Sequence, residues 1–200
     1  MQKIIIASGN QHKIEEIKSF FSDLKIDFLP LPEDKKLPEV IEDGKSYREN
    51  ALKKARQRAA ELNEVVLADD SGLSVEYLAG APGIRSARFG GDDLDDREKY
   101  LKIISLLEGI NGEQRKAAFI SVLALVDPFK EEEIVVEGRC EGLIVQQPAG
   151  EHGFGYDPIF YLPKFNKTMA EISPETKNKI SHRAKALQKL KEVLKECYME

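Results

Sequence analysis

The chain has 200 residues, of which 42% are hydrophobic and 32% charged, and its net charge is −5. This balance predicts one globular domain with a substantial core. It argues against a protein that coats nucleic acid, because that task needs a basic field. Cys140 and Cys197 lack metal-type spacing and form no disulfide framework. No apolar run approaches membrane-spanning length, and the apolar run near the N-terminus is too short for a signal peptide. We therefore expect a cytoplasmic protein with no membrane partner.

The first element is a buried strand, Lys3–Ala7, which ends at the polar turn Ser8-Gly9-Asn10. Apolar residues at helical spacing then predict a helix over 11–23, and a second short strand follows at Ile26–Leu31. A turn that opens a helix presents free backbone N–H groups, which favour an anion. Lys13 opposes the helix dipole there, which is useful beside a phosphate. An ordinary turn with an exposed lysine is the alternative.

A proline-rich, acidic loop over 32–44 leads to the next helix, which is predicted at Tyr47–Leu62. Ser46 is the expected N-cap, and Glu49 three residues later completes the pattern of a capping box. Asn50 lies near the helix start and could face either solvent or a site. Acidic loops are usually solvated, so the loop alone indicates no chemistry.

The stretch that follows is an apolar run, Val65–Ala68, that ends in Asp69 and Asp70 and then Ser71-Gly72. The run is typical of a buried strand, and Ser-Gly predicts a turn after it. Carboxylates at the end of a strand can hold a hard cation and orient a water. Adjacent strand residues point to opposite sides, so we expect one working carboxylate and one that supports it. A solvated turn is the alternative.

The middle of the chain contains a glycine-rich loop with two arginines over 80–91, which either pair with carboxylates or anchor a partner subunit. Asp95-Asp96 is expected to cap a helix over 97–107. Two long apolar strands, 117–126 and 134–144, predict an antiparallel hairpin. Cys140 lies in the second strand and is expected to be a packed thiol.

The last third opens with the loop Gly153–Pro158, where two glycines flank an aromatic residue. A base could stack on Phe154 while Asp157 or backbone groups read its edge. The alternative is a turn whose aromatic side chains fill the core. A short helix that carries Lys177 follows, and Ser181-His182-Arg183 precedes the final helix. Apolar spacing predicts a buried stripe on that final helix, formed by Ala184, Leu187, Leu190, Leu194 and Cys197.

Strand–helix alternation followed by a hairpin predicts an α/β protein with a mixed sheet flanked by helices. The pattern also suggests two lobes with a central substrate cleft. The absence of linkers, repeats and low-complexity tracts favours one domain over residues 1–200.

Taken together, these stretches resemble the inosine triphosphate pyrophosphatase family, also called Ham1-like. The resemblance covers nearly the whole chain, and six motifs in this order make it specific. The motifs are Ser8-Gly9-Asn10-x-x-Lys13, Glu49-Asn50-Ala51, Ala68-Asp69-Asp70-Ser71-Gly72-Leu73, Pro82-Gly83-Ile84-x-Ser86-Ala87-Arg88, Gly153-Phe154-Gly155-Tyr156-Asp157-Pro158-Ile159-Phe160 and Ser181-His182-Arg183.

The resemblance implies an enzyme that hydrolyses ITP, dITP and XTP to the monophosphate and pyrophosphate. It also implies dependence on Mg²⁺, an elongated mixed sheet with two lobes, and a homodimer. The implied task is to cleanse the nucleotide pool of deaminated purines.

The resemblance further implies a role for each motif. Asp70 would be the base that orients or deprotonates water, with Asp69 in support, and activation of the water through the metal stays an open variant. The metal would be held by Asp70 with either Glu39 or Glu42. The phosphate chain would be bound by Ser8, Gly9, Asn10, Gln11, His12, Lys13, Ser71 and Lys177, and the base by Phe154, Gly155, Tyr156, Asp157, His182 and Arg183.

Two alternatives remain open at this point, one a related enzyme and the other a protein of a different class. A Maf-like nucleotide pyrophosphatase would lack the pairing of the Gly-Phe-Gly-Tyr-Asp-Pro and Ser-His-Arg motifs. A nucleotide-sensing module without catalysis would have lost the acidic pair, and consumption of ITP would distinguish it from an enzyme.

Overall fold

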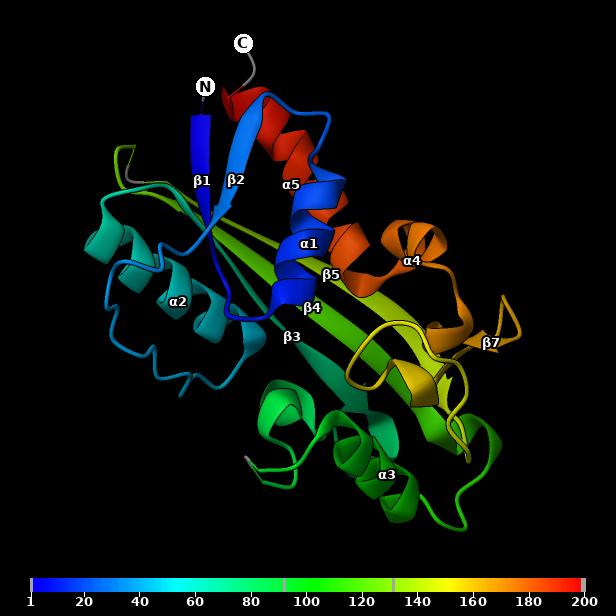
Figure 1. Cartoon of the computed structure of the whole chain (residues 1–200). Helices are drawn as coiled ribbons and strands as arrows, with labels where there is room; N and C mark the ends of the chain where they lie inside the picture. Colours follow the sequence, from blue (N-terminus) through cyan, green and yellow to red (C-terminus); the bar gives the residue numbers. More distant parts are fainter. Residues whose placement is uncertain (1, 92, 131, 199–200) are drawn as a thin grey trace. The chain divides into compact units, whose positions relative to one another are not determined.

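A computed structural model describes residues 2–91, 93–130 and 132–198, and in this part of the chain the strands form one seven-stranded sheet (Figure 1). Its strand order is β2-β1-β3-β4-β5-β6-β7. The strands are β1 (Gln2–Ala7), β2 (Ile26–Pro30), β3 (Val66–Val75), β4 (Lys116–Asp127), β5 (Glu132–Ile144), β6 (Phe160–Leu162) and β7 (Lys167–Thr168). The helices are α1 (Gln11–Phe20), α2 (Tyr47–Leu62), α3 (Asp96–Leu106), α4 (Pro174–Ile180) and α5 (His182–Tyr198).

The sheet is mixed, as the sequence predicts. Strand β1 pairs in parallel with both β2 and β3, whereas β6 pairs antiparallel with β5 and β7. Strands β4 and β5 are neighbours, as expected for the two strands of a hairpin. Within the described ranges, no helix is long and apolar enough to cross a bilayer.

The chain divides into two compact units, and strands β3, β4 and β5 contribute residues to both. The first unit comprises Met1–Asp70, Ser121–Gly138 and Arg183–Glu200, and the second comprises Ser71–Ile120 and Arg139–His182. The division agrees with the expectation of two lobes. The single domain and the central cleft stay predictions.

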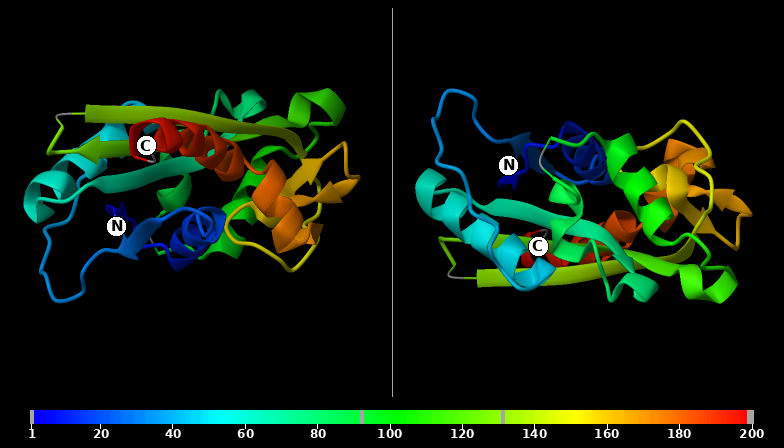
Figure 2. Two further views of the ribbon diagram at one scale, coloured as in Figure 1. Left: turned by 90° about the horizontal axis from the view of Figure 1, so that it is seen from above. Right: turned by 90° about the horizontal axis from the view of Figure 1, so that it is seen from below.

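The core of the first unit is formed largely by α1, α5, β1 and β2, and Figures 1 and 2 show α1 and α5 side by side. Ile14 and Ile17 of α1 belong to the same buried cluster as Leu187 and Leu190 of α5. The stripe predicted on the last helix, with Ala184, Leu187, Leu190 and Leu194, is buried. The prediction that Cys197 also belongs to it lies outside the described side chains.

The second unit has its own core, which includes Leu73, Ile103, Phe119 and Phe160. Cys140 is buried in it, as expected for a packed thiol. The buried guanidinium of Arg115 donates hydrogen bonds of 2.6–3.0 Å to four backbone carbonyls. Because these carbonyls follow α3 and lie at the end of β5, Arg115 joins the two elements.

Helix boundaries follow the predicted caps closely. Helix α2 has the predicted limits, with Ser46 Oγ accepting from the N–H of Glu49 at 3.2 Å. The Glu49 carboxylate accepts from Lys45 N–H at 2.7 Å, so the returning half of the capping box is displaced by one residue. Helix α1 ends at Phe20 rather than at the predicted Asp23.

The turn predicted at Ser71-Gly72 is wrong, because β3 runs unbroken from Val66 to Val75. Gly72 is required for packing instead: a Cβ there would lie 2.3 Å from Ser86 Oγ and 2.6 Å from the carbonyl oxygen of Gly83. A glycine inside a strand often marks such a close approach. The two aspartates therefore lie within a strand rather than at its end.

Candidate active site

The sheet register brings the turn over 8–13, which is predicted to bind phosphate, next to Asp69 and Asp70. Strands β1 and β3 are parallel, and Ala7 lies opposite Ala68. Ser8 and Asp69, the next residues of the two chain segments, are therefore neighbours across the pair. Ligands of α/β proteins bind at the carboxyl ends of parallel strands, which is where β1 ends.

Within the turn, two predicted ligand side chains are engaged locally. Ser8 Oγ accepts from the N–H of Asn10 at 3.1 Å, and Asn10 Oδ1 accepts from the N–H of Lys13 at 3.3 Å, which caps α1. Gln11 and His12 are exposed in the first turn of the helix. A Cβ at Gly9 would meet no described atom within 4 Å, so a ligand can approach its backbone closely.

Asp69 is the centre of a buried ion-pair network in the first unit. One carboxylate oxygen accepts from Ser121 Oγ at 2.9 Å, and the other contacts Arg183 Nε at 3.0 Å and Lys13 Nζ at 3.2 Å. Arg183 also pairs with Glu16 of α1 at 2.5 Å. The network therefore connects β3, β4, α1 and α5.

The environment of Asp69 keeps it ionised. Burial acts to raise the pKa of Asp69, but the charges of Arg183 and Lys13 and the hydrogen bonds from Ser121 and Arg183 outweigh it, so the pKa lies well below its ordinary value. A carboxylate held this firmly is a poor proton acceptor. Its position suits the supporting role that the sequence predicts for one of the two aspartates.

Asp70 has the opposite character. It is 7% exposed, and its Oδ2 atom finds no hydrogen-bond partner among the described residues. Burial raises the pKa of Asp70 to about 6, and Glu42 contributes to the rise, whereas Lys54, Asn50 and Lys13 oppose it. A buried carboxylate with an unsatisfied oxygen is costly to keep, which favours a functional reason for it.

The acidic loop brings Glu42, rather than Glu39, to Asp70. Glu42 is half-buried and its Oε1 lies 2.5 Å from Lys54 Nζ, and its charge acts on Asp70. Glu39 is exposed. The end of the loop is fixed to α2 because Asn50 Oδ1 accepts from the N–H of Gly44 at 2.8 Å.

These residues fit a hard divalent cation. In the described ranges, no three histidine, cysteine or acidic side chains gather closely enough to hold a metal by themselves. Mg²⁺ is usually bound by one or two carboxylates together with substrate phosphates, and it retains several waters. The unsatisfied Oδ2 of Asp70 and the neighbouring carboxylate of Glu42 provide such a donor pair.

In the second unit, the loop Gly153–Pro158 and α4 form a cluster around Asp157. The buried Asp157 Oδ2 accepts from Lys177 Nζ at 2.7 Å and from the N–H of Phe154 at 3.0 Å. Lys177 Nζ also lies 4.5 Å from the centre of the Phe154 ring, in a cation–π contact. The contacts of Lys177 are thus with the predicted base-binding residues, although the resemblance also assigns it to the phosphates.

The same loop is held by further hydrogen bonds. Tyr156 Oη donates to the carbonyl oxygen of Ser86 at 2.7 Å, and Asp96 at the start of α3 accepts from the N–H of Gly155 at 2.8 Å. Gly153 has φ +81°, and a Cβ there would lie 2.0 Å from Asp157 Oδ2, so only glycine fits. The loop therefore has a defined shape before any ligand binds.

The remaining predicted residues have varied settings. His182 is buried and stacks on Phe119 with ring centres 4.8 Å apart. Arg183 is 1% exposed and is engaged by Asp69 and Glu16, so its predicted contact with the purine stays a prediction. Ser71 is half-buried in β3.

Three residues of the first unit, Ser121, Glu16 and Lys54, belong to the site without having been predicted, and Asn50, which the sequence leaves open between solvent and a site, faces the site. Ser121 and Glu16 complete the Asp69 network, and Lys54 and the buried amide of Asn50 lie beside Asp70. The four-residue spacing of Asn50 and Lys54, which puts both on one face of a helix, was the available signal. Ser121 and Glu16 have no local signal, because their partners are distant in the sequence.

Known proteins resemble the chain throughout its length. The sequence model described as the Ham1 family matches residues 4–193. Proteins named dITP/XTP pyrophosphatase from Shouchella clausii and Clostridium perfringens are each 45% identical, over 97% and 98% of both chains respectively. A solved structure of a HAM1 protein from Coxiella burnetii, 40% identical, superposes with a TM-score of 0.91 over 98% of this chain and 100% of that one. The Ham1 protein of Staphylococcus aureus, 41% identical, gives 0.87 over 98% and 99%.

Proposed function

Because this chain belongs to the Ham1 family, we propose that it hydrolyses dITP, XTP and ITP to the nucleoside monophosphate and pyrophosphate. The names of its relatives, which it matches over nearly their whole lengths, support this activity. The observation that carries it is the buried carboxylate of Asp70, unsatisfied at Oδ2 and beside Glu42. The cellular task would be to remove deaminated purines from the nucleotide pool.

We assign a magnesium ion to Asp70 and Glu42 of the first unit. When bound, the ion would offset the negative charge that develops on the phosphate oxygens. The half-buried Glu42 is preferred over the exposed Glu39 for this role. The net charge of −5 makes local cations necessary for an anionic substrate.

Asp70 is also the proposed proton acceptor. In the metal-free protein its pKa is raised to about 6, which suits a carboxylate that takes a proton from a water aimed at the α-phosphorus. Where Oδ2 holds the metal instead, activation of that water through the ion is the alternative. The pKa of Asp69 lies well below its ordinary value because of Arg183 and Lys13, and its carboxylate holds Lys13 at the start of α1. Lys13 then receives the phosphate chain, together with backbone N–H groups of the turn other than those that donate to Ser8 Oγ and Asn10 Oδ1.

Residues of the second unit are proposed to recognise the base. Phe154 offers a ring for stacking, and Lys177 and Asp157 provide a donor and an acceptor beside it. A six-oxo purine has an acceptor where adenine has a donor, so a fixed donor would reject adenine by leaving a polar group unpaired. These contacts favour the base, rather than the phosphates, as the partner of Lys177.

A homodimer and a cytoplasmic location remain part of the proposal. Arg85 and Arg88 of the glycine-rich loop are exposed and could contribute to contact with a second copy. Light scattering of the purified protein would measure its mass and so test the dimer.

The substrate and the reaction are tested together by measuring pyrophosphate and phosphate release from XTP, ITP, dITP, GTP and ATP with Mg²⁺. We expect pyrophosphate as the product, and rates for XTP, ITP and dITP far above those for GTP and ATP. Release of phosphate, or equal rates for all bases, would contradict the proposal.

A further inference from the structure

Lys54 occupies a place beside the two carboxylates that are proposed to hold the metal. It lies on α2 one turn after Asn50, and its Nζ is 2.5 Å from Glu42 Oε1 and 3.3 Å from the backbone carbonyl oxygen of Asp69. The side chains of Lys54 and Glu42 are only 16% and 24% exposed. The ion pair is therefore partly withdrawn from solvent, where charges interact more strongly than at the surface.

The ammonium group also acts on Asp70. The charges of Lys54 and Glu42 both reach this carboxylate, with opposite signs. Glu42, Asp70 and Lys54 thus form a local group with two negative charges and one positive charge when Asp70 is ionised. Without Lys54, two poorly solvated carboxylates would face each other with less compensation.

We propose that Lys54 is an internal counter-ion that neutralises the Glu42–Asp70 pair in the metal-free protein and releases Glu42 when a divalent cation binds there. The inference rests on the proposed function, which assigns the metal to these carboxylates. A lysine suits the exchange, because its ammonium group sits on a flexible four-carbon stem and can rotate away. The carbonyl oxygen of Asp69 remains available to it as an acceptor.

The proposal predicts two effects of opposite sign. Removing the positive charge leaves a more negative site, so a divalent cation binds more tightly. It also exposes the two carboxylates to mutual repulsion in the absence of metal, so the metal-free protein becomes less stable. A purely structural lysine would give the second effect but would not tighten metal binding.

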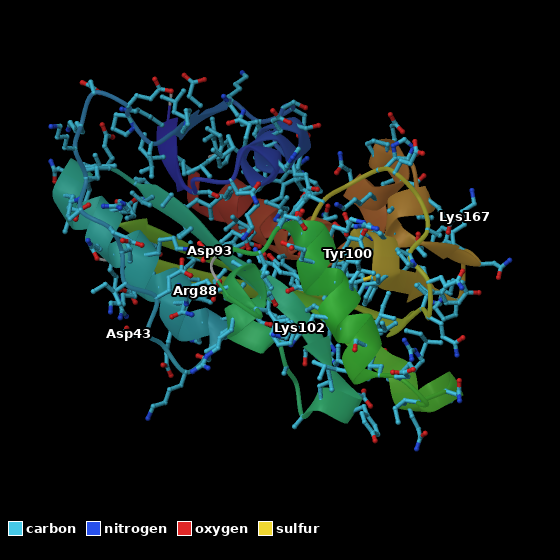
Figure 3. The ribbon with its side chains drawn as sticks, turned by 60° about the horizontal axis from the view of Figure 1, so that its bottom comes forward. Asp43, Arg88, Asp93, Tyr100, Lys102 and Lys167 are labelled. Atoms are coloured by element: carbon cyan, nitrogen blue, oxygen red, sulfur yellow. The ribbon has the colours of Figure 1, made fainter. Side chains whose placement is uncertain are left out.

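Lys53 provides a matched control on the same helix. Its Nζ pairs with Asp43 Oδ1 at 2.5 Å, and these side chains are 41% and 67% exposed. Asp43 is labelled in Figure 3, in the loop that precedes α2. Lys53→Met removes the same charge one residue away without removing the partner of Glu42.

The experiment titrates Mn²⁺ into the full chain without nucleotide and follows free Mn²⁺ by electron paramagnetic resonance. We expect Lys54→Met to bind roughly tenfold more tightly than the wild type, the change produced by about 1.4 kcal/mol. Lys53→Met should change the dissociation constant by less than about twofold, since exposed charges are screened. In chelator, Lys54→Met should melt below the wild type, and excess Mn²⁺ should remove most of that difference.

The outcomes separate this inference from the proposed function. Wild-type binding that is lost in Asp70→Asn, with equal or weaker binding by Lys54→Met, would overturn the counter-ion role and leave the metal site standing. Equal tightening by Lys53→Met would also overturn it, because the effect would then come from overall charge. If the wild type and Asp70→Asn bind Mn²⁺ with the same affinity, both the metal site and the counter-ion role are overturned.

Discussion

Asp69 and Asp70 are adjacent in β3, but their carboxylates have opposite pKa shifts because they meet different partners. Asp69 is surrounded by Arg183, Lys13 and Ser121, which stabilise its charge. Asp70 is buried with an unsatisfied oxygen, and the nearby charge of Glu42 adds to the effect of burial. The same substitution, Asp to Asn, should therefore affect stability in opposite directions at the two positions.

Asp69→Asn should lower the free energy of unfolding by about 3–5 kcal/mol, because it leaves buried cations without their counter-charge. Asp70→Asn should instead raise it by roughly 1–3 kcal/mol in chelator near pH ~8, since it removes a charge that burial disfavours. Urea unfolding of both variants measures the two changes. Loss of stability in Asp70→Asn as large as that in Asp69→Asn would contradict the assignment of roles.

The pH dependence of the Asp70 effect follows from its raised pKa of about 6. Between the unfolded-state pKa and about 6 the native protein binds the extra proton, so stability falls as pH rises through this window. The advantage of Asp70→Asn should therefore grow from pH ~4.5 to pH ~7 and then level. The depressed pKa of Asp69 has the opposite consequence: its contribution is complete above the unfolded-state pKa and is lost only as pH falls below it.

At the scale of residues, the sequence predicts the chemistry but not the partners. The motif indicates that one aspartate works and the other supports it, and alternation along a strand gives the physical reason. It does not indicate that Arg183, 114 residues later, is the partner of Asp69, or that Ser121 is another. Such contacts depend on how distant segments pack, which spacing within a motif does not contain.

At the scale of elements, β3 connects the acidic pair to the packing of the short helical segment Gly83–Arg88. Gly72 allows Ser86 to approach the strand, where Ser86 Oγ accepts from the N–H of Leu73 at 2.9 Å. The carbonyl oxygen of Ser86 in turn accepts a hydrogen bond from the hydroxyl of Tyr156, in the loop Gly153–Pro158 that is predicted to bind the base. A change at Gly72 should therefore disturb a loop that is distant in the sequence.

Gly72→Ala should lower the free energy of unfolding by about 1–3 kcal/mol, as expected when a group is forced into a packed interior. Gly9→Ala is the matched control, because a Cβ there meets no described atom within 4 Å and should leave stability within about 0.5 kcal/mol of the wild type. Urea unfolding of the two variants measures the difference. Equal stability of Gly72→Ala and the wild type would show that the strand and the segment can separate without cost.

Caps and periodic apolar stripes locate most elements from sequence alone. The limits of α2 follow from Ser46 and the apolar spacing, and the buried stripe of α5 is as predicted. The turn signal at Ser71-Gly72 fails because glycine serves two physical purposes, backbone freedom and close approach, and here it serves the second. The sequence does not distinguish them.

At the scale of the whole molecule, the candidate functions separate along the two units. The turn over 8–13, Asp69, Asp70 and Glu42 belong to the first unit. The loop with Phe154 and Asp157, together with Lys177 of α4, belongs to the second. Each cluster is held by contacts within its own unit. The family and the mixed sheet follow from the sequence motifs, whereas the choice of Glu42 over Glu39 needs the structure.

The central claim is that water attacks the α-phosphorus and pyrophosphate leaves. Hydrolysis of XTP in water enriched in heavy oxygen, with the products weighed by mass spectrometry, tests it most directly. We predict that the label enters the nucleoside monophosphate alone, that pyrophosphate stays unlabelled, and that Asp70→Asn forms neither product at a comparable rate. Label in pyrophosphate, or nucleoside diphosphate and phosphate as products, would contradict the account.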